Sequence, residues 1–256
     1  MNDNTTGELV IEARNIGVTF KVLDGEVEAV RDVSFRLHKG QTIALVGESG
    51  SGKSVTARAI MRLLSKRAVV TPQTEIIYDG RDMAKLPQDE MRRLRGNRLT
   101  MIFQEPMSSL NPVYTVGAQI VEVLRIHNKI SKAAAWKKAI DLLTEVQIPD
   151  PEARVRQFPH QLSGGQRQRV MIAMALANNP DVLIADEPTT ALDVTVQAEI
   201  LNLIAALKAK TGMAVILITH DLTVVRQFAD YVYVMQHGLV REEGAAETLF
   251  ANPQHP

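Results

Sequence analysis

One segment of the chain has the residue types needed to bind phosphate groups. Residues 47–54 read GESGSGKS, which matches the pattern G-x-x-x-x-G-K-[ST] in full. The glycines at 47, 50 and 52 let backbone N–H groups converge on an anion at the start of a helix, where the helix dipole favours negative charge. The segment also follows an apolar run and precedes a helix-like stretch, which is the strand–loop–helix context that the pattern requires.

Two side chains of this loop are expected to act on a nucleotide. Lys53 should reach the β- and γ-phosphates, and the hydroxyl of Ser54 should bind Mg²⁺. The alternative is a Gly- and Ser-rich turn that only caps a helix, and the complete pattern argues against it. The predicted contacts of the loop with nucleotide are Gly47, Glu48, Ser49, Gly50, Ser51, Gly52, Lys53, Ser54 and Val55.

A pair of acids ends a second apolar run. Residues 182–187 read VLIADE, and burying two carboxylates is costly unless they hold a cation. Asp186 is therefore the candidate metal-side carboxylate, while Glu187, one residue on, points differently and is the candidate general base for an attacking water. The alternative is that the acids cap the helix that follows Pro188.

The sequence LSGGQ at residues 162–166 resembles the signature of the ABC ATPases. Ser163, Gly164, Gly165 and Gln166 provide a hydroxyl and backbone amides at a helix start, which is a second anion site. The resemblance implies that two such domains dimerise head to tail, so that each signature loop clamps the γ-phosphate held by the opposite phosphate loop. Taken alone, Ser163 could equally be an ordinary helix N-cap.

Further residues match markers of the same family. Gln104 resembles the glutamine that contacts Mg²⁺ and the attacking water, and His220, after the apolar run AVILIT, resembles the histidine that contacts the γ-phosphate. Ala191, Leu192 and Asp193 resemble the loop that crosses the dimer interface. The resemblance thus implies ATP and Mg²⁺ as cofactors.

The predicted site divides by role. Lys53, Gln104, Glu187 and His220 are expected to be catalytic, and Ser54, Gln104 and Asp186 are expected to hold the metal. Phe20 is a candidate for stacking on adenine, although it could equally be a core residue of a strand, and tyrosine is commoner at that place in the family.

The sequences that flank the motifs indicate which subfamily the chain resembles. EPMSSLNP at 105–112 and FPHQ at 158–161 look like importers of dipeptides, oligopeptides, glutathione and related compounds. In those systems a permease docks after the glutamine, so the stretch between Glu105 and Tyr114 is expected to contact permease subunits and, through them, a substrate-binding protein. The ending ANPQHP stops inside a phrase that relatives usually continue, so we expect either the first half of a protein with two fused ATPase domains or a trimmed single-domain subunit.

Composition excludes several other classes. The 256 residues include no cysteine, which rules out disulfides and thiolate-bound metals. Basic and acidic residues balance at 29 each, so no overall field attracts nucleic acid, and no nucleic-acid partner is expected. Apolar runs stop well short of the roughly 20 residues of a membrane span. We therefore expect a soluble, peripheral protein held at the cytoplasmic face of the membrane by its partners.

These motifs require an α/β fold that can position them. The expected architecture is a P-loop NTPase core with a mixed central sheet, an N-terminal antiparallel β subdomain at residues 1–40 and an inserted α-helical subdomain at residues 105–169. The core would comprise residues 41–104 and 170–256, with apolar strands at residues 42–46, 182–185 and 214–219. A hairpin is expected around residues 236–238.

Other functions remain as alternatives. A soluble ABC ATPase acting on ribosomes or DNA would use the same motifs, but the long heptad repeats or basic blocks that it needs do not occur. A non-hydrolysing regulatory domain would have a damaged site, whereas all the motif residues are present. A GTPase would carry an Asn-Lys-x-Asp pattern, which is missing.

Overall fold

The structure, a computed structural model, describes residues 7–23, 25–104, 109–190 and 192–254. The chain divides into two compact units, one formed by residues 1–92 with 212–256 and the other by residues 93–211. These bounds differ from the subdomain limits expected at residues 40, 104 and 169, and that three-part division stays a prediction.

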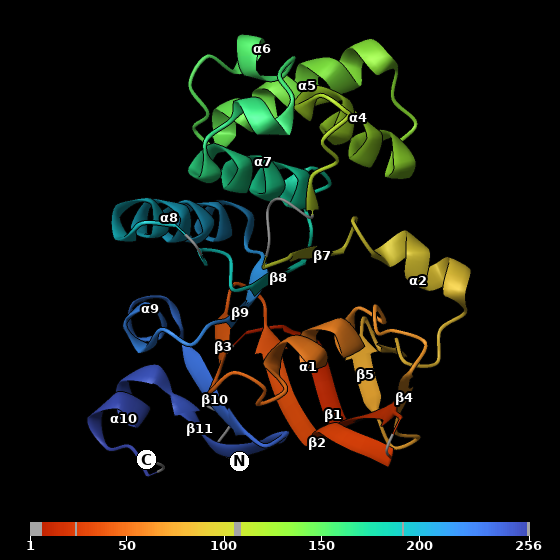
Figure 1. The fold of residues 1–256 in the computed structure, drawn as a ribbon, viewed down its shortest axis with the longest axis vertical. Coiled ribbons are helices and arrows are strands. Elements are labelled where there is room, and N and C mark those ends of the chain that lie inside the picture. The colour runs from red at the N-terminus through yellow and green to blue at the C-terminus, as the bar shows by residue number, and fades with distance from the viewer. Residues whose placement is uncertain (1–6, 24, 105–108, 191, 255–256) are drawn as a thin grey trace. The chain divides into compact units, whose positions relative to one another are not determined.

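The first unit is built on a mixed sheet (Figure 1). Its strands are β1 (Leu9–Val22), β2 (Gly25–His38), β3 (Thr42–Val46), β4 (Ala68–Val70), β5 (Glu75–Tyr78), β6 (Arg81–Asp82), β9 (Ala214–Ile218), β10 (Tyr231–Gln236) and β11 (Leu239–Ala245). They follow the order β6-β5-β1-β2-β11-β10-β3-β9, with β4 paired to β1. Antiparallel pairing joins β1 to β2 and β5, whereas β3 is parallel to both β9 and β10.

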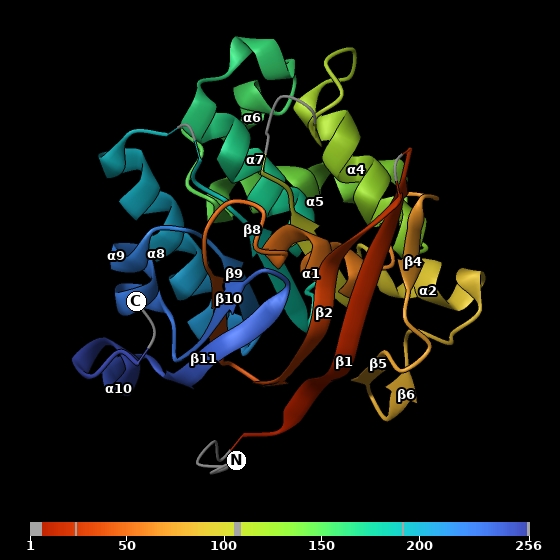
Figure 2. The same ribbon diagram turned by 60° about the horizontal axis from the view of Figure 1, so that its bottom comes forward.

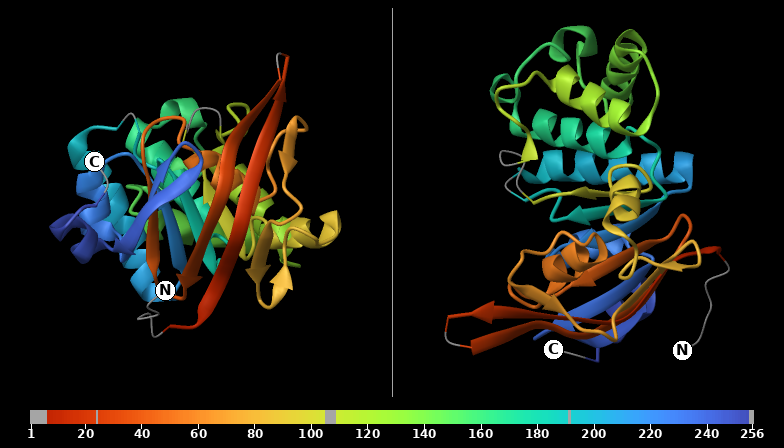
Figure 3. Two further views of the ribbon diagram at one scale, coloured as in Figure 1. Left: turned by 90° about the horizontal axis from the view of Figure 1, so that it is seen from below. Right: turned by 90° about the vertical axis from the view of Figure 1, so that its right-hand side faces the viewer.

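The burial of the strands agrees with the way in which they pair. Every residue of β3 and β9 is buried, as expected for central parallel strands covered on both faces. The first two strands instead mix buried and exposed residues and form a long hairpin beside β11 (Figure 3). The predicted antiparallel layer, the apolar strands β3 and β9 and the β10–β11 hairpin are thus confirmed. Strands β4, β5 and β6 were not anticipated.

The described helices of this unit include α1 (Lys53–Ile60), α9 (Leu222–Phe228) and α10 (Ala246–Ala251), and α2 (Gln88–Leu94) contains the sequence boundary between the two units. The first of them packs on β1 and β2. Helix α9 contacts β3, and helix α10 contacts β10 and β11. A small apolar core joins both helices to β3 and β10. The residues of that core are Ala44, Val46, Val225, Val232 and Ala246.

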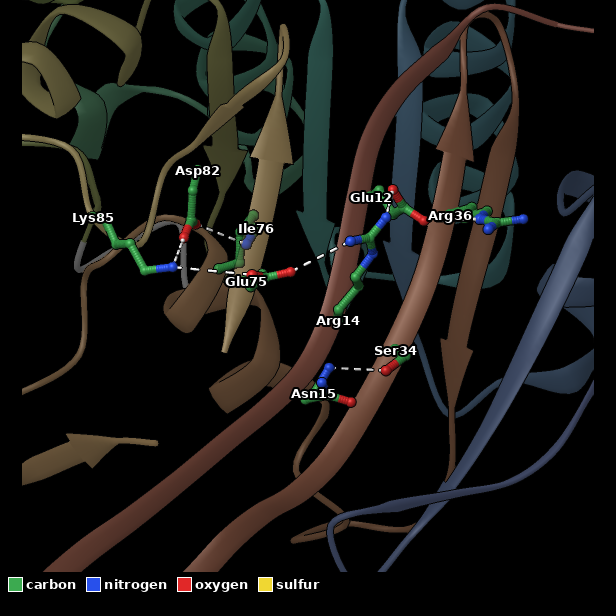
Figure 4. Close-up of polar contacts among 9 residues, drawn as sticks. All are labelled: Glu12, Arg14, Asn15, Ser34, Arg36, Glu75, Ile76, Asp82 and Lys85. Atoms are coloured by element: carbon green, nitrogen blue, oxygen red, sulfur yellow. Dashed lines mark hydrogen bonds and ion pairs between the residues drawn. The ribbon is translucent and has the colours of Figure 1, made fainter. Parts of the chain in front are cut away.

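Charged side chains join neighbouring strands of the antiparallel layer (Figure 4). Glu12 on β1 accepts hydrogen bonds from Arg14 at 2.7 Å and from Arg36 on β2 at 3.1 Å. Arg14 in turn reaches Glu75 on β5 at 3.4 Å. Partial burial favours the neutral form of Glu12, but the two guanidinium groups outweigh it and lower its pKa.

Asp82 fastens the edge of this layer. Its carboxylate accepts the backbone N–H groups of Ile76 at 3.1 Å and Ala84 at 3.0 Å, and it pairs with the Lys85 ammonium at 2.9 Å. Burial tends to raise the pKa of Asp82, but the lysine and the two amides dominate, so the pKa is lowered. The ionised carboxylate therefore stabilises the turn that follows β6 and joins it to β5.

The second unit combines two parallel strands with a set of helices. The elements are β7 (Leu99–Ile102), β8 (Val182–Asp186), α4 (Val116–His127), α5 (Lys132–Glu145), α6 (Pro151–Arg154), the 3₁₀ helix η1 (Pro159–Gln161), α7 (Gly164–Leu176) and α8 (Val194–Thr211). Thr115, Ser131 and Ser163 cap α4, α5 and α7 through their hydroxyl groups. Helices α4, α5 and α7 pack on one another, so the helical stretches expected from the sequence are present. Among the described residues, we find no helix with the length and apolar character to cross a membrane.

We predict that Asp82→Asn lowers the free energy of unfolding by about 1 kcal/mol at neutral pH, because it removes the partner of Lys85 and weakens two charge-assisted hydrogen bonds. Since the folded-state pKa of Asp82 is lowered, the stability that its charge contributes is present above the unfolded pKa and is lost as the pH falls through the folded pKa. Urea unfolding of wild type and variant at a series of pH values measures this. A difference that stays constant down to acid pH would contradict it.

Candidate nucleotide-binding site

The phosphate loop leaves the buried strand β3 and ends in α1. It is pressed against neighbouring backbone at both ends. A Cβ atom at Gly47 would overlap the carbonyl oxygen of Met235 at the end of β10, and one at Gly52 would lie 2.5 Å from the carbonyl oxygen of Ala29 in β2. Both glycines have positive φ, 145° and 104°. No other residue could hold this close-packed path, so the glycines fix the shape of the loop.

The side chain of Lys53 folds back onto the phosphate loop and donates hydrogen bonds to its backbone. The side chain is buried, and Nζ donates to the carbonyl oxygens of Gly47 at 2.7 Å and Glu48 at 2.8 Å. Ser51 Oγ lies 3.4 Å from the same nitrogen. The loop therefore surrounds a cation, which is costly to bury unless an anion compensates its charge.

The start of α1 adds to this positive character. Gly52 precedes the helix with no side chain to cap it, and the first turn carries no acid. The amide groups of that turn and the helix dipole therefore favour an anion at the same end as Lys53. Ser54 and Val55 are half-buried in this turn, while Glu48, Ser49 and Gly50 are exposed on the outside of the loop.

His220 belongs to the same unit as the phosphate loop. Strands β3 and β9 are parallel neighbours, with Leu45 opposite Ile218. Gly47 and His220 each follow these partners by two residues, so both lie at the carboxyl ends of adjacent strands, where ligands bind in open α/β sheets. The histidine is exposed.

Phe20 also lies in this unit. It is half-buried on β1, opposite Val27 of β2 and Ala68 of β4. Val27 is close in sequence to Ala29, the β2 residue against which the loop packs. The geometry is compatible with both interpretations of Phe20, as a strand residue and as a partner for adenine.

The second unit brings Gln104 and Glu187 together. Gln104 follows β7, Glu187 follows β8, and the two strands pair up to Ile102 and Ala185. Gln104 Nε2 donates to Glu187 Oε2 at 2.8 Å, and Thr190 Oγ1 donates to the same oxygen at 2.9 Å.

The backbone of Glu187 is in the left-handed region, with φ of 46°, which is unfavourable for a residue with a side chain. Asp186, the last residue of β8, is 1% exposed. The different roles expected for the two carboxylates stay a prediction. Thr190 was not anticipated.

The signature residues form a helix start with a reciprocal cap. Ser163 Oγ accepts from the N–H of Gln166 at 3.3 Å, and Gln166 Oε1 accepts from the N–H of Ser163 at 3.1 Å. Ser163 thus does cap a helix, as the alternative interpretation held, while Ser163 and Gly164 remain exposed and Gly165 half-buried. A cap and an anion site are compatible, because the backbone amides of the first turn still point outward.

Asp193 also caps a helix, because its Oδ1 accepts the N–H of Val196 at 2.9 Å at the start of α8. Leu192 is half-buried. Ala191 and residues 105–108 of the predicted permease contact lie outside the described residues. Within the described residues, no three His, Asp or Glu side chains group as in an all-protein metal site. Mg²⁺ at nucleotides uses only one or two protein oxygens beside the phosphates, so the hydroxyl of Ser54 in the first unit and the carboxylate of Asp186 in the second are each chemically suitable ligands.

Comparison with known proteins agrees with these features. A family model described as "ABC transporter" matches residues 30–190. The oligopeptide transport ATP-binding protein OppD of Bacillus subtilis is 54% identical over 96% of this chain and 69% of its own length. The peptidoglycan transport ATP-binding protein YejF of Agrobacterium fabrum is 53% identical over 98% of this chain, which spans only 46% of that protein.

A solved structure shares the fold. It is the dimeric ATP-binding cassette MJ0796 in a post-hydrolysis state bound to ADP and phosphate, which is 29% identical with a TM-score of 0.82 over 92% of this chain and 98% of that one. This likeness confirms the predicted α/β class with a mixed sheet and helical parts. Together with the family match and the high identity to two ATP-binding proteins of transporters, it shows that the chain belongs to the ABC transporter family, as an ATP-binding protein.

Proposed function

We propose that this chain is the ATP-hydrolysing motor subunit that powers a membrane permease importing peptides or peptide-like compounds. The observation that carries the proposal is the 54% identity to an oligopeptide transport ATP-binding protein over 96% of the chain. The dipeptide transport ATP-binding protein DppD of Bacillus subtilis, 52% identical over 97% of the chain, supports the same class of cargo. The cargo itself would be bound by the partners.

In this proposal the phosphate loop binds the triphosphate of ATP. Lys53, held within the loop by two carbonyl oxygens, exchanges them for the β- and γ-phosphates, and the amides of the loop and of the first turn of α1 bind the remaining oxygens. Phe20 provides a face on which adenine stacks. His220 contacts the γ-phosphate from the end of the neighbouring strand.

Ser54, Gln104 and Asp186 would hold Mg²⁺, which neutralises charge on the phosphates when bound. Glu187 acts as the general base. Both groups that hydrogen-bond its Oε2, Gln104 and Thr190, are neutral donors, so they orient the carboxylate without removing its capacity to accept a proton from water.

The proposed partners follow from the same family. A second ATPase domain, identical, different or fused, would contribute its signature loop to this site and receive Ser163, Gly164, Gly165 and Gln166 in return. Asp193 would lie at that interface. The structure of the cassette MJ0796 is dimeric, which supports a paired arrangement. Closure on ATP and reopening after hydrolysis would then move the permease.

Permease subunits would dock on the stretch between Glu105 and Tyr114. Its described part includes two exposed apolar side chains, Val113 at 71% and Tyr114 at 55%, which suit a protein contact. A substrate-binding protein would act indirectly through the permease. In this proposal the chain acts at the cytoplasmic face of the membrane, and no nucleic-acid partner is expected.

We predict that Lys53→Met weakens ATP binding at least 100-fold, because charge-assisted hydrogen bonds to two phosphates are lost, each worth about 1.5–3 kcal/mol. Calorimetric titration of ATP measures the effect. Lys66→Met, at an exposed lysine of the same unit, is the matched control and should bind like wild type. Equal losses in the two variants would contradict a specific role for Lys53.

Glu187→Gln tests the hydrolytic mechanism. We expect kcat to fall about 100-fold or more with ATP binding retained, because the base is lost while the shape of the side chain is kept. Light scattering should then detect ATP-dependent pairs of the variant, and wild-type turnover should rise more than linearly with protein concentration. Glu247→Gln, at an exposed glutamate of α10, should behave as wild type. Full activity of Glu187→Gln in a strict monomer would refute the shared-site mechanism.

Tyr114→Ser tests the docking site. In membranes that contain the permease, we expect transport and permease-stimulated hydrolysis to fall severalfold, while ATP hydrolysis by the isolated chain is unchanged. Ile126→Ser removes an apolar side chain of similar exposure, 66%, from α4 outside this stretch, and should leave transport intact. The docking site would be wrong if both variants transported normally, or if both failed equally.

A further inference from the structure

The turn between β10 and β11 lies directly behind the phosphate loop. It consists of His237 and Gly238, which both have positive φ, 51° and 78°. In the sheet, this hairpin is inserted between β2 and β3 (Figure 2). Because β3 leads into the phosphate loop and β2 packs against it, the turn occupies the space between the two.

Hydrogen bonds connect the turn to both neighbours. The N–H of Gly238 donates to the carbonyl oxygen of Ser51 in the loop at 3.1 Å, and the N–H of Arg31 in β2 donates to the carbonyl oxygen of Gly238 at 2.8 Å. The carbonyl of Met235, just before the turn, is the group that excludes a side chain at Gly47. The hairpin thus contacts the beginning and the middle of the phosphate loop.

Further hydrogen bonds connect Ser51 to Lys53. The N–H of Ser51 donates to the carbonyl oxygen of Glu48 at 3.2 Å, and Lys53 Nζ donates to that same oxygen at 2.8 Å. A continuous set of hydrogen bonds therefore runs from Gly238 through Ser51 and Glu48 to the ammonium group.

Only glycine fits at position 238. A Cβ atom there would lie 2.9 Å from the carbonyl oxygen of Ala29 and 3.2 Å from its carbonyl carbon. These are backbone atoms of β2, not the end of a flexible side chain, so the Cβ could be admitted only if backbone moved. A side chain would instead push the turn, and with it Ser51, away from its present position.

We propose that the turn of His237 and Gly238 is a positioning element for the phosphate loop, which sets the affinity for ATP without touching the nucleotide. The inference rests on the proposed role of the loop in binding ATP phosphates. It assigns to Gly238 an effect on nucleotide affinity that goes beyond its effect on stability.

The structure provides a matched control for this proposal. Asp79 and Gly80 join β5 to β6 in a two-residue turn with nearly the same φ values, 50° and 68°. A Cβ atom at Gly80 meets nothing within 4 Å. Gly80→Ala therefore reproduces the backbone strain of Gly238→Ala without the contact to the phosphate-loop region.

The test measures the dissociation constant of ATP by titration calorimetry for wild type, Gly238→Ala and Gly80→Ala, well below their melting temperatures. We expect about tenfold or greater weakening in Gly238→Ala and less than twofold in Gly80→Ala, with a lower Tm in both variants. Equal affinities in the two variants would overturn the positioning role. A wild type that fails to bind ATP would instead refute the proposed function.

A second measurement uses the unmodified chain, in case Gly238→Ala does not fold. Amide hydrogen exchange is followed by NMR with and without a non-hydrolysable ATP analogue and Mg²⁺. The Gly238 amide should exchange at least severalfold more slowly when nucleotide is bound, whereas the Gly80 amide should change little. Equal changes at both amides would refute the coupling between turn and loop.

Discussion

The buried ammonium group of Lys53 is the constraint around which the first unit is organised. It hydrogen-bonds to two backbone carbonyl groups of the phosphate loop, and it lies at the N-terminus of α1, where the helix dipole adds positive charge. Such an arrangement is costly on its own and becomes favourable when a polyanion binds. The contacts of Gly47 and Gly52 with the backbones of Met235 and Ala29 restrict the shape of the loop, so little of the binding free energy is spent on ordering it.

The rest of the sheet provides rigidity and direction. Strands β3 and β9 are wholly buried and parallel, so the residues after their carboxyl ends, Gly47 and His220, emerge at one edge. The second unit has a similar arrangement with two strands. Gln104 and Glu187 follow the parallel strands β7 and β8, and their side chains form a 2.8 Å hydrogen bond. In both units, candidate site residues such as His220, Gln104 and Glu187 follow strands, and strands vary less in position than loops.

Much of this could be predicted from local patterns. The phosphate loop, the acidic pair and the helix cap at Ser163 each depend on neighbouring residues, and the apolar runs of β3, β8 and β9 indicate burial directly. The supports could not be predicted in this way. Ala29, Met235 and Gly238 contact the loop from distant parts of the sequence. Thr190 contacts Glu187 within a turn whose left-handed residue is a glutamate, and no glycine marks that position in the sequence. The strands β4, β5 and β6 were missed because, at 3, 4 and 2 residues, they are too short to show a periodic pattern.

If the loop recognises phosphate groups through its positive site, affinity must depend on the number of phosphates in the ligand. Calorimetric titration of the wild-type chain with adenosine, AMP, ADP and ATP at constant Mg²⁺ measures this dependence. We expect affinity to rise steeply along the series, with ATP and ADP binding about 100-fold or more tightly than AMP, since each additional phosphate gains charge-assisted hydrogen bonds worth about 1.5–3 kcal/mol. Binding of AMP or adenosine as tight as that of ATP would contradict it, because the affinity would then come from the base and not from the loop.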